Sequence, residues 1–292
     1  QGKKGLYVFK SPDGIRWSLI KDEPVITEGY FDSQNLAFWD PLTGKYVDYH
    51  RTFIDGVRSI MMCISDDFVT WSEPVLLKYP DTPNQHLYTN AIRPYLHAPH
   101  IRVGFPTRFT PKTQQVEPVF MSSRDGVTFH RFNDAIIPQS APKDRDGNRS
   151  NYMTYGLLEL PVQPDELSVY ATEAYYAGPD SRVRRFTYRK DGFVAMLGSG
   201  EVLTKPLTFD GETLGINYRC KDGGSLLVEV CDESGMVISG FSRSDCDALA
   251  GDATDQAVSW SSGKGFADLK DTPIRIRFVL KDAELYAMQF KE

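Results

Sequence analysis

Residues 31–71 read FDSQNLAFWDPLTGKYVDYHRTFIDGVRSIMMCISDDFVTW. The stretch opens on four polar residues, continues as three apolar or alternating runs at 35–39, 45–53 and 57–64, and closes on a Ser-Asp-Asp turn followed by Trp71. Runs of this length with period-2 alternation, separated by Gly, Pro and Asp, are typical of β-strands. The stretch therefore predicts one four-stranded sheet with a polar mouth at one end.

The closing turn of this stretch recurs along the chain. SPDGIRW at 11–17, SDDFVTW at 65–71 and SRDGVTF at 123–129 share a Ser, an Asp two residues later and an aromatic residue after the turn. The Ser positions differ by 65 − 11 = 54 and 123 − 65 = 58 residues, a spacing near that of propeller blades. Asp and Gly suit the backbone of the turn, and we expect the aromatic residue to pack between adjacent sheets.

Helical periodicity is nearly absent, so the predicted fold class is all-β. Further strands are expected at 88–95, 100–106, 117–123, 154–160, 167–173 and 182–189. From about residue 201 the chain gives short strands at regular intervals, including 213–219, 225–231, 273–280 and 284–290, which is typical of a β-sandwich. We predict a propeller domain over 1–195, a sandwich over 196–292, and a long rim loop at 139–151.

Composition narrows the range of partners. The net charge is −6 and no Lys/Arg-rich run stands out, which argues against nucleic acid and against an anionic membrane as the main partner. No stretch approaches the roughly 18 to 20 apolar residues of a membrane span. The four cysteines, Cys63, Cys220, Cys231 and Cys246, lack metal-ligand spacing, and the sequence leaves open either a disulfide among the last three or free buried thiols.

Several segments together resemble one known family. They are SPDGIRW, FDSQNLAFWD, SDDFVTWSEP, QHLYTNAIRPY, GFPTRF, FMSSRDGVTF, YGLLELP, VYATEAY and RFTYRKDGF. They look like the family-32-like glycosyl hydrolases that are frequent in bacterial genomes. These are five-bladed propellers related to the invertase, fructanase and arabinanase group, with a C-terminal sandwich. The resemblance extends to KPLTFDG and RFVLKDAELY near the end of the chain.

Measured against that template, the chain supplies about three and a half of five blades. Residues 1–28 match the outer half of one blade, and 31–78, 86–135 and 152–195 match three more. A propeller closes by pairing its first and last strands, and an open sheet edge invites aggregation. Our hypothesis is that a second chain, or N-terminal residues outside this sequence, completes the ring.

The resemblance implies carboxylate chemistry in the central funnel. Glycoside hydrolysis needs two carboxylates that flank the scissile bond, one protonated and one ionised. Asp32 precedes the inner strand of the opening blade, where the relatives carry an aspartate, although counting back from the Trp-Asp pair puts Gln34 in strict register. Glu159 and Glu173 are the other candidate acids, since an acid in an apolar strand is costly to bury without a partner. The third blade has His86-Leu87-Tyr88-Thr89-Asn90 where the relatives carry a glutamate.

Other polar residues near inner-strand ends suit sugar binding through planar donors, and the excess of arginine suggests an anionic sugar. The predicted substrate-binding residues are Gln34, Asn35, Arg51, Arg58, His86, Asn90, Arg108 and Arg124. For each of them a structural hydrogen bond is the alternative.

The sequence contains no nucleophile elbow, P-loop, dinucleotide fingerprint or zinc pattern. The loop Asp144-Arg145-Asp146-Gly147-Asn148 lacks the later glutamate of a calcium loop. We therefore expect no metal and no cofactor.

Three functions remain open on these residues. The first is hydrolysis of a glycosidic bond in a poly- or oligosaccharide, which makes a carbohydrate the expected substrate. The second is glycan binding without catalysis, which the absent third-blade glutamate favours. The third is a structural or partner-binding propeller, because a fold does not fix a function.

Overall fold

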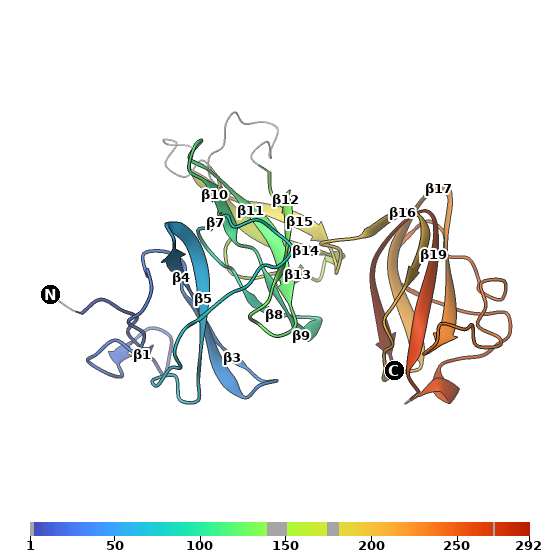
Figure 1. The fold of residues 1–292 in the computed structure, drawn as a ribbon, viewed down its shortest axis with the longest axis horizontal. Helices are drawn as coiled ribbons and strands as arrows, with labels where there is room; N and C mark the ends of the chain where they lie inside the picture. Colours follow the sequence, from blue (N-terminus) through green and yellow to red (C-terminus); the bar gives the residue numbers. More distant parts are fainter. Residues whose placement is uncertain (1–2, 139–150, 174–180, 271) are drawn as a thin grey trace. The chain divides into compact units, whose positions relative to one another are not determined.

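The computed structural model describes residues 3–138, 151–173, 181–270 and 272–292. Within them the chain forms β-strands and one short 3-10 turn, η1 (Ala267–Leu269), so the predicted all-β class is confirmed (Figure 1). The contacts divide the chain into a first unit, Gln1–Leu158 with Ser168–Phe186, and a second unit, Glu159–Leu167 with Thr187–Glu292. The predicted rim loop and the calcium-like loop at 144–148 lie outside the described residues, apart from Asn151.

Sheet one contains the opening stretch of the sequence and has the order β3-β4-β5-β6, all antiparallel. Its strands are β3 (Leu36–Asp40), β4 (Lys45–Ile54), β5 (Val57–Ser65) and β6 (Val75–Leu76). Asp55 and Gly56 join β4 to β5 with φ angles of 50° and 78°, the conformation of a two-residue hairpin turn that Asp-Gly favours. Chain order and spatial order agree, as in a propeller blade.

Sheet two repeats this up-and-down plan with two interrupted strands. Its strands are β7 (His86–Leu87), β8 (Arg93–Tyr95), β9 (Ala98–Gly104), β10 (Thr107–Thr110), β11 (Gln115–Ser123) and β12 (His130–Ala135). β9 and β10 pair with β11 in one register, Met121 opposite Gly104 and Thr107 opposite Pro118. β7 and β8 therefore act as one inner strand, and the sheet is again four strands wide.

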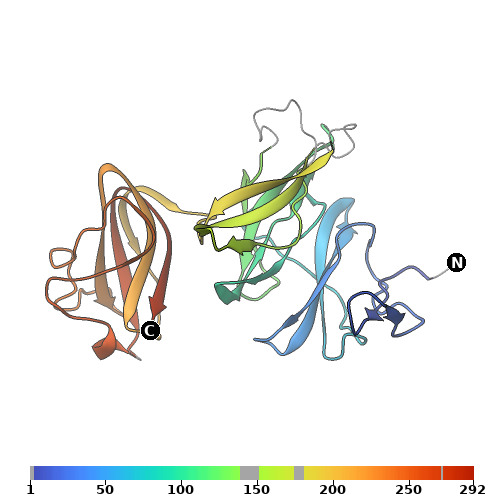
Figure 2. The same ribbon diagram turned by 180° about the vertical axis from the view of Figure 1, so that it is seen from behind.

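A third sheet and a small hairpin complete the strands outside the C-terminal region (Figure 2). Sheet three has the order β13-β14-β15, with β13 (Leu158–Leu160), β14 (Gln163–Glu173) and β15 (Arg182–Arg189). The hairpin is β1 (Phe9–Lys10) paired with β2 (Ser18–Leu19). These sheets have the strand order of propeller blades, while the total of five blades stays a prediction.

The three Ser-Asp turns share one hydrogen-bond pattern. Each Ser hydroxyl accepts the backbone N–H three residues later, and each Asp carboxylate accepts two backbone N–H groups further along. The residue after the Asp has a positive φ in every copy: Gly14 at 73°, Phe68 at 66° and Gly126 at 77°. Phe68 therefore holds a strained conformation that glycine adopts freely.

The aromatic residues that follow the three turns differ in their packing. Phe129 is fully buried and packs against Tyr49 at a ring distance of 6.4 Å, in the cluster that joins sheets one and two. Trp17 and Trp71 instead donate their indole N–H to the turn carbonyls of Gly14 and Phe68, and Trp17 remains 61% exposed. The prediction of packing between sheets is confirmed for the third copy.

The second unit is built on two long strands. Its sheet has the order β16-β19-β17-β18, with β16 (Met196–Leu203), β17 (Thr213–Asp232), β18 (Asp252–Ala257) and β19 (Ile274–Lys291). Separate strands at 213–219 and 225–231 were expected, but they are parts of one strand, β17, in which residues 221–224 form a bulge where the register with β19 shifts. Both halves of each strand contribute to one apolar core. All four cysteines are free thiols.

We predict that Gly126→Ala destabilises the protein more than Gly14→Ala. Both substitutions put a Cβ at positive φ, which costs about 1–2 kcal/mol. At Gly126 the Cβ would also lie 3.0 Å from the Tyr49 hydroxyl, whereas at Gly14 nothing lies within 4 Å. Chemical denaturation of both variants measures the difference, and equal losses would contradict the packing assigned to the third turn.

Acid should weaken the second turn through Asp67. The backbone N–H groups of Thr70 and Val69 lower the pKa of Asp67 from its usual 3.8 to about 2. A lowered folded-state pKa stabilises the fold above pH 3.8, and that stabilisation disappears as the pH falls toward 2. The difference in thermal midpoint between the wild type and Asp67→Asn should therefore be constant near neutral pH and shrink between pH 3.8 and 2. A difference that persists unchanged at pH 2 would contradict this.

Candidate functional site

The ring of Tyr88 contacts residues of sheet one, of sheet two and of the segment just before sheet three. The guanidinium carbons of Arg51 and Arg58, from sheet one, lie 5.0 Å and 4.9 Å from the centre of this ring. Phe109 of sheet two contacts it at 6.0 Å, and Tyr152, just before sheet three, at 5.8 Å. We call these five residues the Tyr88 cluster.

Strand alternation explains why sheet one presents these side chains together. Side chains two residues apart point to the same face of a strand, so Tyr49, Arg51 and Phe53 of β4 share one face. Phe53 lies directly opposite Arg58 on β5. Both guanidiniums also lie over the Phe53 ring, at 5.5 Å for Arg51 and 5.1 Å for Arg58. The two cations are therefore held by two aromatic rings.

One carboxylate is bonded to a residue of this cluster, and it is exposed. Asp32 accepts a charge-assisted hydrogen bond from Arg51, whose side chain is 4% exposed, while the Asp32 side chain is 70% exposed. The hydrogen bond from Arg51 is the main cause that lowers the pKa of Asp32, with the charge of Arg58 adding to it. Asp32 is therefore ionised at neutral pH and faces solvent.

Arg58 has a histidine beside it instead of a carboxylate. Its backbone N–H donates to His86 Nδ1 at 3.2 Å, and its Nη1 lies 3.4 Å from the same atom. Burial, followed by the charge of Arg58, lowers the pKa of His86, so His86 is neutral at pH 7. The Nε of Arg58, and the Nε and Nη1 of Arg51, are buried without a hydrogen-bond partner.

Two predicted sugar-binding residues, Gln34 and Asn90, instead join the polar segment before β3 to the segment between β7 and β8 of sheet two. The Gln34 side chain accepts the backbone N–H groups of Asn90 and Ala91 at 3.2 Å and 2.7 Å. Asn90 is 1% exposed and donates to the carbonyls of Gln34 and Tyr49. Asn35 donates to two carbonyls of its own segment. These amides hold the backbone beside the Tyr88 cluster in position.

The remaining predicted arginines occupy different ends of sheet two. Arg108 lies in β10 beside the cluster residue Phe109, pairs with Glu117, and donates to the Asn133 carbonyl at 2.8 Å. Arg124 is exposed and follows Ser123, which lies opposite Arg102. Arg102 forms a buried ion pair with Asp40, the last residue of β3. Arg124 therefore lies at the opposite end of the sheets from Asp32, and the structure does not bring it to the Tyr88 cluster.

The two predicted glutamates are both ion-paired. Glu173 ends β14, is 0% exposed, and accepts hydrogen bonds from the Nε atoms of Arg182, at 2.6 Å, and Arg184. Its neighbour Thr172 bonds to the backbone of the cluster residue Tyr152. Glu159 belongs to the second unit and pairs with Lys190 at 3.0 Å. Glu173 therefore lies near the Tyr88 cluster, and its carboxylate is ion-paired with Arg182 and Arg184.

The sequence analysis did not single out Tyr88, Phe53 or Tyr152. Tyr88 lies two residues after His86, and Phe53 lies two residues after Arg51 on β4. In an extended chain, residues two apart point to the same side. That pattern is the signal that could have identified Tyr88 and Phe53.

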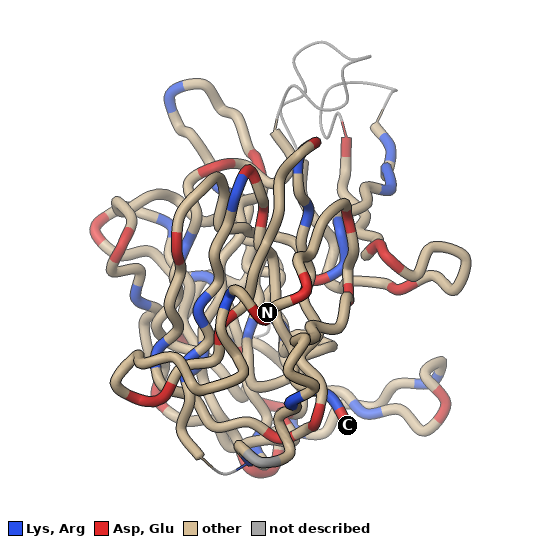
Figure 3. Tube along the Cα trace, turned by 90° about the vertical axis from the view of Figure 1, so that its right-hand side faces the viewer, with Lys and Arg blue, Asp and Glu red and all other residues tan. Residues whose placement is uncertain are grey.

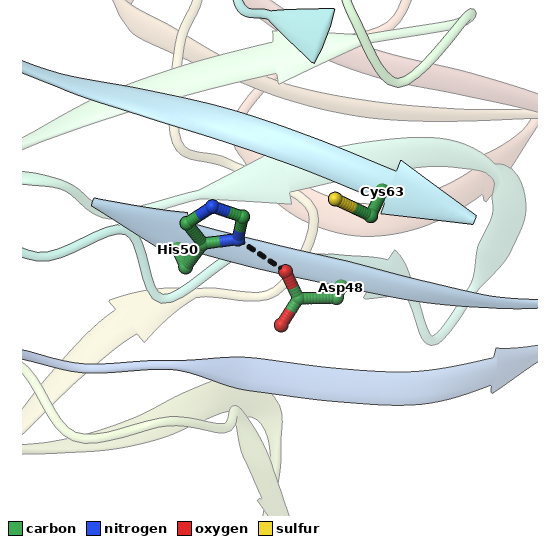
Figure 4. A group of neighbouring side chains, drawn as sticks. All are labelled: Asp48, His50 and Cys63. Atoms are coloured by element: carbon green, nitrogen blue, oxygen red, sulfur yellow. Dashed lines mark hydrogen bonds and ion pairs between the residues drawn. The ribbon is translucent and has the colours of Figure 1, made fainter. Parts of the chain in front are cut away.

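One group of potential metal ligands gathers in the described residues, on the other face of sheet one (Figure 4). Asp48 Oδ2 lies 2.5 Å from His50 Nδ1, and Cys63 lies opposite Asp48 on β5. Burial raises the pKa of Asp48, and raises that of the Cys63 thiol to about 12. Zinc accepts this combination of ligands, but it requires a thiolate, and burial keeps the Cys63 thiol protonated at neutral pH. We therefore assign no metal here.

A cavity of about 530 Å³ lies in the second unit and is lined by Asp165, Arg189, Asp252, Ala253, Thr254 and Asp255. Each of its charged groups already has a partner, including Asp255, which pairs with Lys291. Arg189 donates to Asp252 and to two backbone carbonyls, and the Thr254 hydroxyl donates to Asp165. We therefore assign no ligand to this cavity.

Charge is distributed evenly over the described chain. Basic and acidic residues are interspersed along the trace (Figure 3). No helix among the described residues is long and apolar enough to cross a membrane.

No family model and no curated protein sequence matches this chain. Among solved structures it is similar to a glycoside hydrolase, at 16% identity and a TM-score of 0.41, covering 60% of this chain and 53% of that one. It is also similar to the β-1,2-mannobiose phosphorylase from Listeria innocua, at 13% identity and a TM-score of 0.46, covering 63% and 50%. A third is the Bombyx mori GH32 β-fructofuranosidase BmSUC1, at 10% identity and a TM-score of 0.38, covering 97% and 72%.

The three structures named are of carbohydrate-active proteins. The chain spans about half the length of the first two. At these TM-scores the similarity identifies no residue and no substrate.

Removing Arg51 should raise the pKa of Asp32. In Arg51→Met the methionine keeps the apolar contact with Tyr88 but loses the hydrogen bond that stabilises the carboxylate. We expect the pKa of Asp32 to move up toward its usual 3.8, and NMR titration of the carboxyl carbon measures this. Arg108→Met is the matched control, since Arg108 pairs with Glu117. An Asp32 pKa that is the same in Arg51→Met and the wild type would contradict the assigned pair.

Proposed function

We propose that this protein binds carbohydrate at the Tyr88 cluster. The observation that supports this most directly is the combination of two guanidiniums, Arg51 and Arg58, stacked on the rings of Tyr88 and Phe53, beside the exposed carboxylate of Asp32. Sugar rings present apolar C–H faces and many hydroxyls. Aromatic faces pack against the first, and planar donors and a carboxylate bond to the second.

The rigidity of the cluster supports a binding role. Gln34 and Asn90 fix the segment that carries Asp32 against the inner strand of sheet two. The Ser33 hydroxyl donates to the Tyr88 carbonyl at 2.6 Å. Side chains held in this way lose little conformational freedom when a ligand binds, so more of the interaction free energy appears as affinity.

Hydrolysis of a glycosidic bond is the second candidate, and the state of Asp32 favours it. A nucleophile or general base in a glycosidase must be ionised and must reach the substrate. Asp32 meets both conditions, because Arg51 lowers its pKa and its side chain is 70% exposed. Glu173 is fully buried between two arginines, which suits a positioning role. We assign no proton donor among the described residues.

A glycan array with the intact protein tests the binding proposal. We expect at least one glycan class to bind, and Tyr88→Leu to weaken that binding about tenfold, since the loss of one aromatic face costs about 1.5 kcal/mol. Tyr46→Leu is the matched control, because Tyr46 lies at the far end of β4 and contacts Trp39 and Phe68. Circular dichroism checks that both variants fold. Binding to no glycan, or equal loss in both variants, would refute the proposal.

Asp32→Asn separates binding from hydrolysis. If Asp32 acts in catalysis, its amide should reduce release of new reducing ends at least a hundredfold, while glycan affinity changes little. Reducing-sugar assays and calorimetry on the same samples measure the two effects. If the wild type binds glycan but releases no product, the protein binds carbohydrate without hydrolysing it. If Asp32→Asn keeps full turnover, Asp32 is not a catalytic residue.

A further inference from the structure

We infer that the carbohydrate bound at the Tyr88 cluster carries an oxyanion, a carboxylate or a sulfate, which Arg58 and Arg51 recognise. This inference rests on the proposed binding function and names the class of ligand. Three features support it: the excess of positive charge at the cluster, the unpaired donors of its arginines, and the neutral His86 beside Arg58.

The cluster has more positive than negative charge. Arg51 and Arg58 converge on the same two rings, and Asp32 is the one carboxylate among the described residues that is bonded to either guanidinium. The side chain of Asp32 is mostly in water, where its charge is screened. The two guanidiniums are largely removed from water, so their attraction for an anion is stronger. An oxyanion would balance the second cation.

The donors of these arginines are incompletely used. Arg51 is 3% exposed and uses one terminal nitrogen on Asp32, while its Nε and Nη1 are buried without a partner. The Nε of Arg58 is in the same state. A buried donor without a partner is costly, and a charged donor more so. Such a cost persists where the group is arranged for a ligand, and the planar fork of a guanidinium can donate two parallel hydrogen bonds to two oxygens of a carboxylate or a sulfate.

His86 cannot supply the balancing group. Its Nδ1 faces the backbone N–H and Nη1 of Arg58, and burial keeps the ring neutral at pH 7. A neutral ring nitrogen accepts one hydrogen bond from Arg58 but removes no charge. His86 therefore orients the guanidinium toward Tyr88 and leaves its charge available to the ligand.

The test compares anionic oligosaccharides with neutral counterparts of the same backbone. The probes are a short oligogalacturonate and its carboxyl-reduced form, and a heparin-derived oligosaccharide and its desulfated form. We expect the anionic member of at least one pair to bind at least tenfold more tightly by calorimetry. The pair that shows the preference identifies a carboxylate or a sulfate as the group recognised.

Arg58→Met supplies the second arm. The methionine keeps the apolar packing on Phe53 and Tyr88, so the fold should persist. We expect affinity for the preferred anionic probe to fall ten- to a hundredfold, and affinity for its neutral counterpart to stay within about twofold. Arg58→Lys, which keeps the charge but not the planar donor, should lose less. Arg124→Met, at the opposite end of the sheets, is the matched control and should change neither affinity.

Three results would overturn the inference. Equal affinity for both members of each pair would show that no oxyanion is recognised, while the proposed carbohydrate binding would still stand. Binding to none of the four probes would also reject the inference, while the wider glycan array decides the proposed function separately. Equal losses in Arg58→Met and Arg124→Met would show a general effect of charge instead of a site.

Discussion

The stacking of Arg51 and Arg58 on the Tyr88 ring is the interaction on which the site depends. It brings sheet one onto the inner strand of sheet two, and the contact of Tyr88 with Tyr152 extends it toward sheet three. A cation over an aromatic face contributes about 0.5–2 kcal/mol, more where water is excluded. Two such contacts on one ring fix both guanidiniums in place before any ligand arrives.

The positions of the strands around this ring depend on turns and on strand registers, which the sequence predicts only in part. The Ser-Asp turns were predicted from their spacing, and all three adopt the same hydrogen-bond pattern. The sequence shows that Phe68 stands where the other two turns have a glycine at positive φ. It does not show the contacts of Phe68 with Tyr46 and Trp71. In the second unit, separate strands were predicted at 213–219 and 225–231. The structure joins them in β17, where residues 221–224 form a bulge opposite β19.

The sequence also predicted only part of the candidate site. Arg51, Arg58, His86 and Asp32 lie in segments that the sequence marked as strand ends, and the structure brings them together. Gln34 and Asn90 lie there too, but their amides bond to backbone groups more than fifty positions away. Arg124 lies at the other end because its strand runs antiparallel to its neighbour. Such pairings follow from register between distant strands, which local patterns do not specify.

The most direct test is to observe Tyr88 while a glycan binds. Protein with isotope-labelled tyrosine rings, titrated with the best ligand from the glycan array, gives one ring signal per tyrosine. The account predicts that the Tyr88 and Tyr152 signals shift most and that Tyr218, in the core of the second unit, stays unchanged. Saturable binding with no shift at Tyr88, or with the largest shift in the second unit, would contradict it.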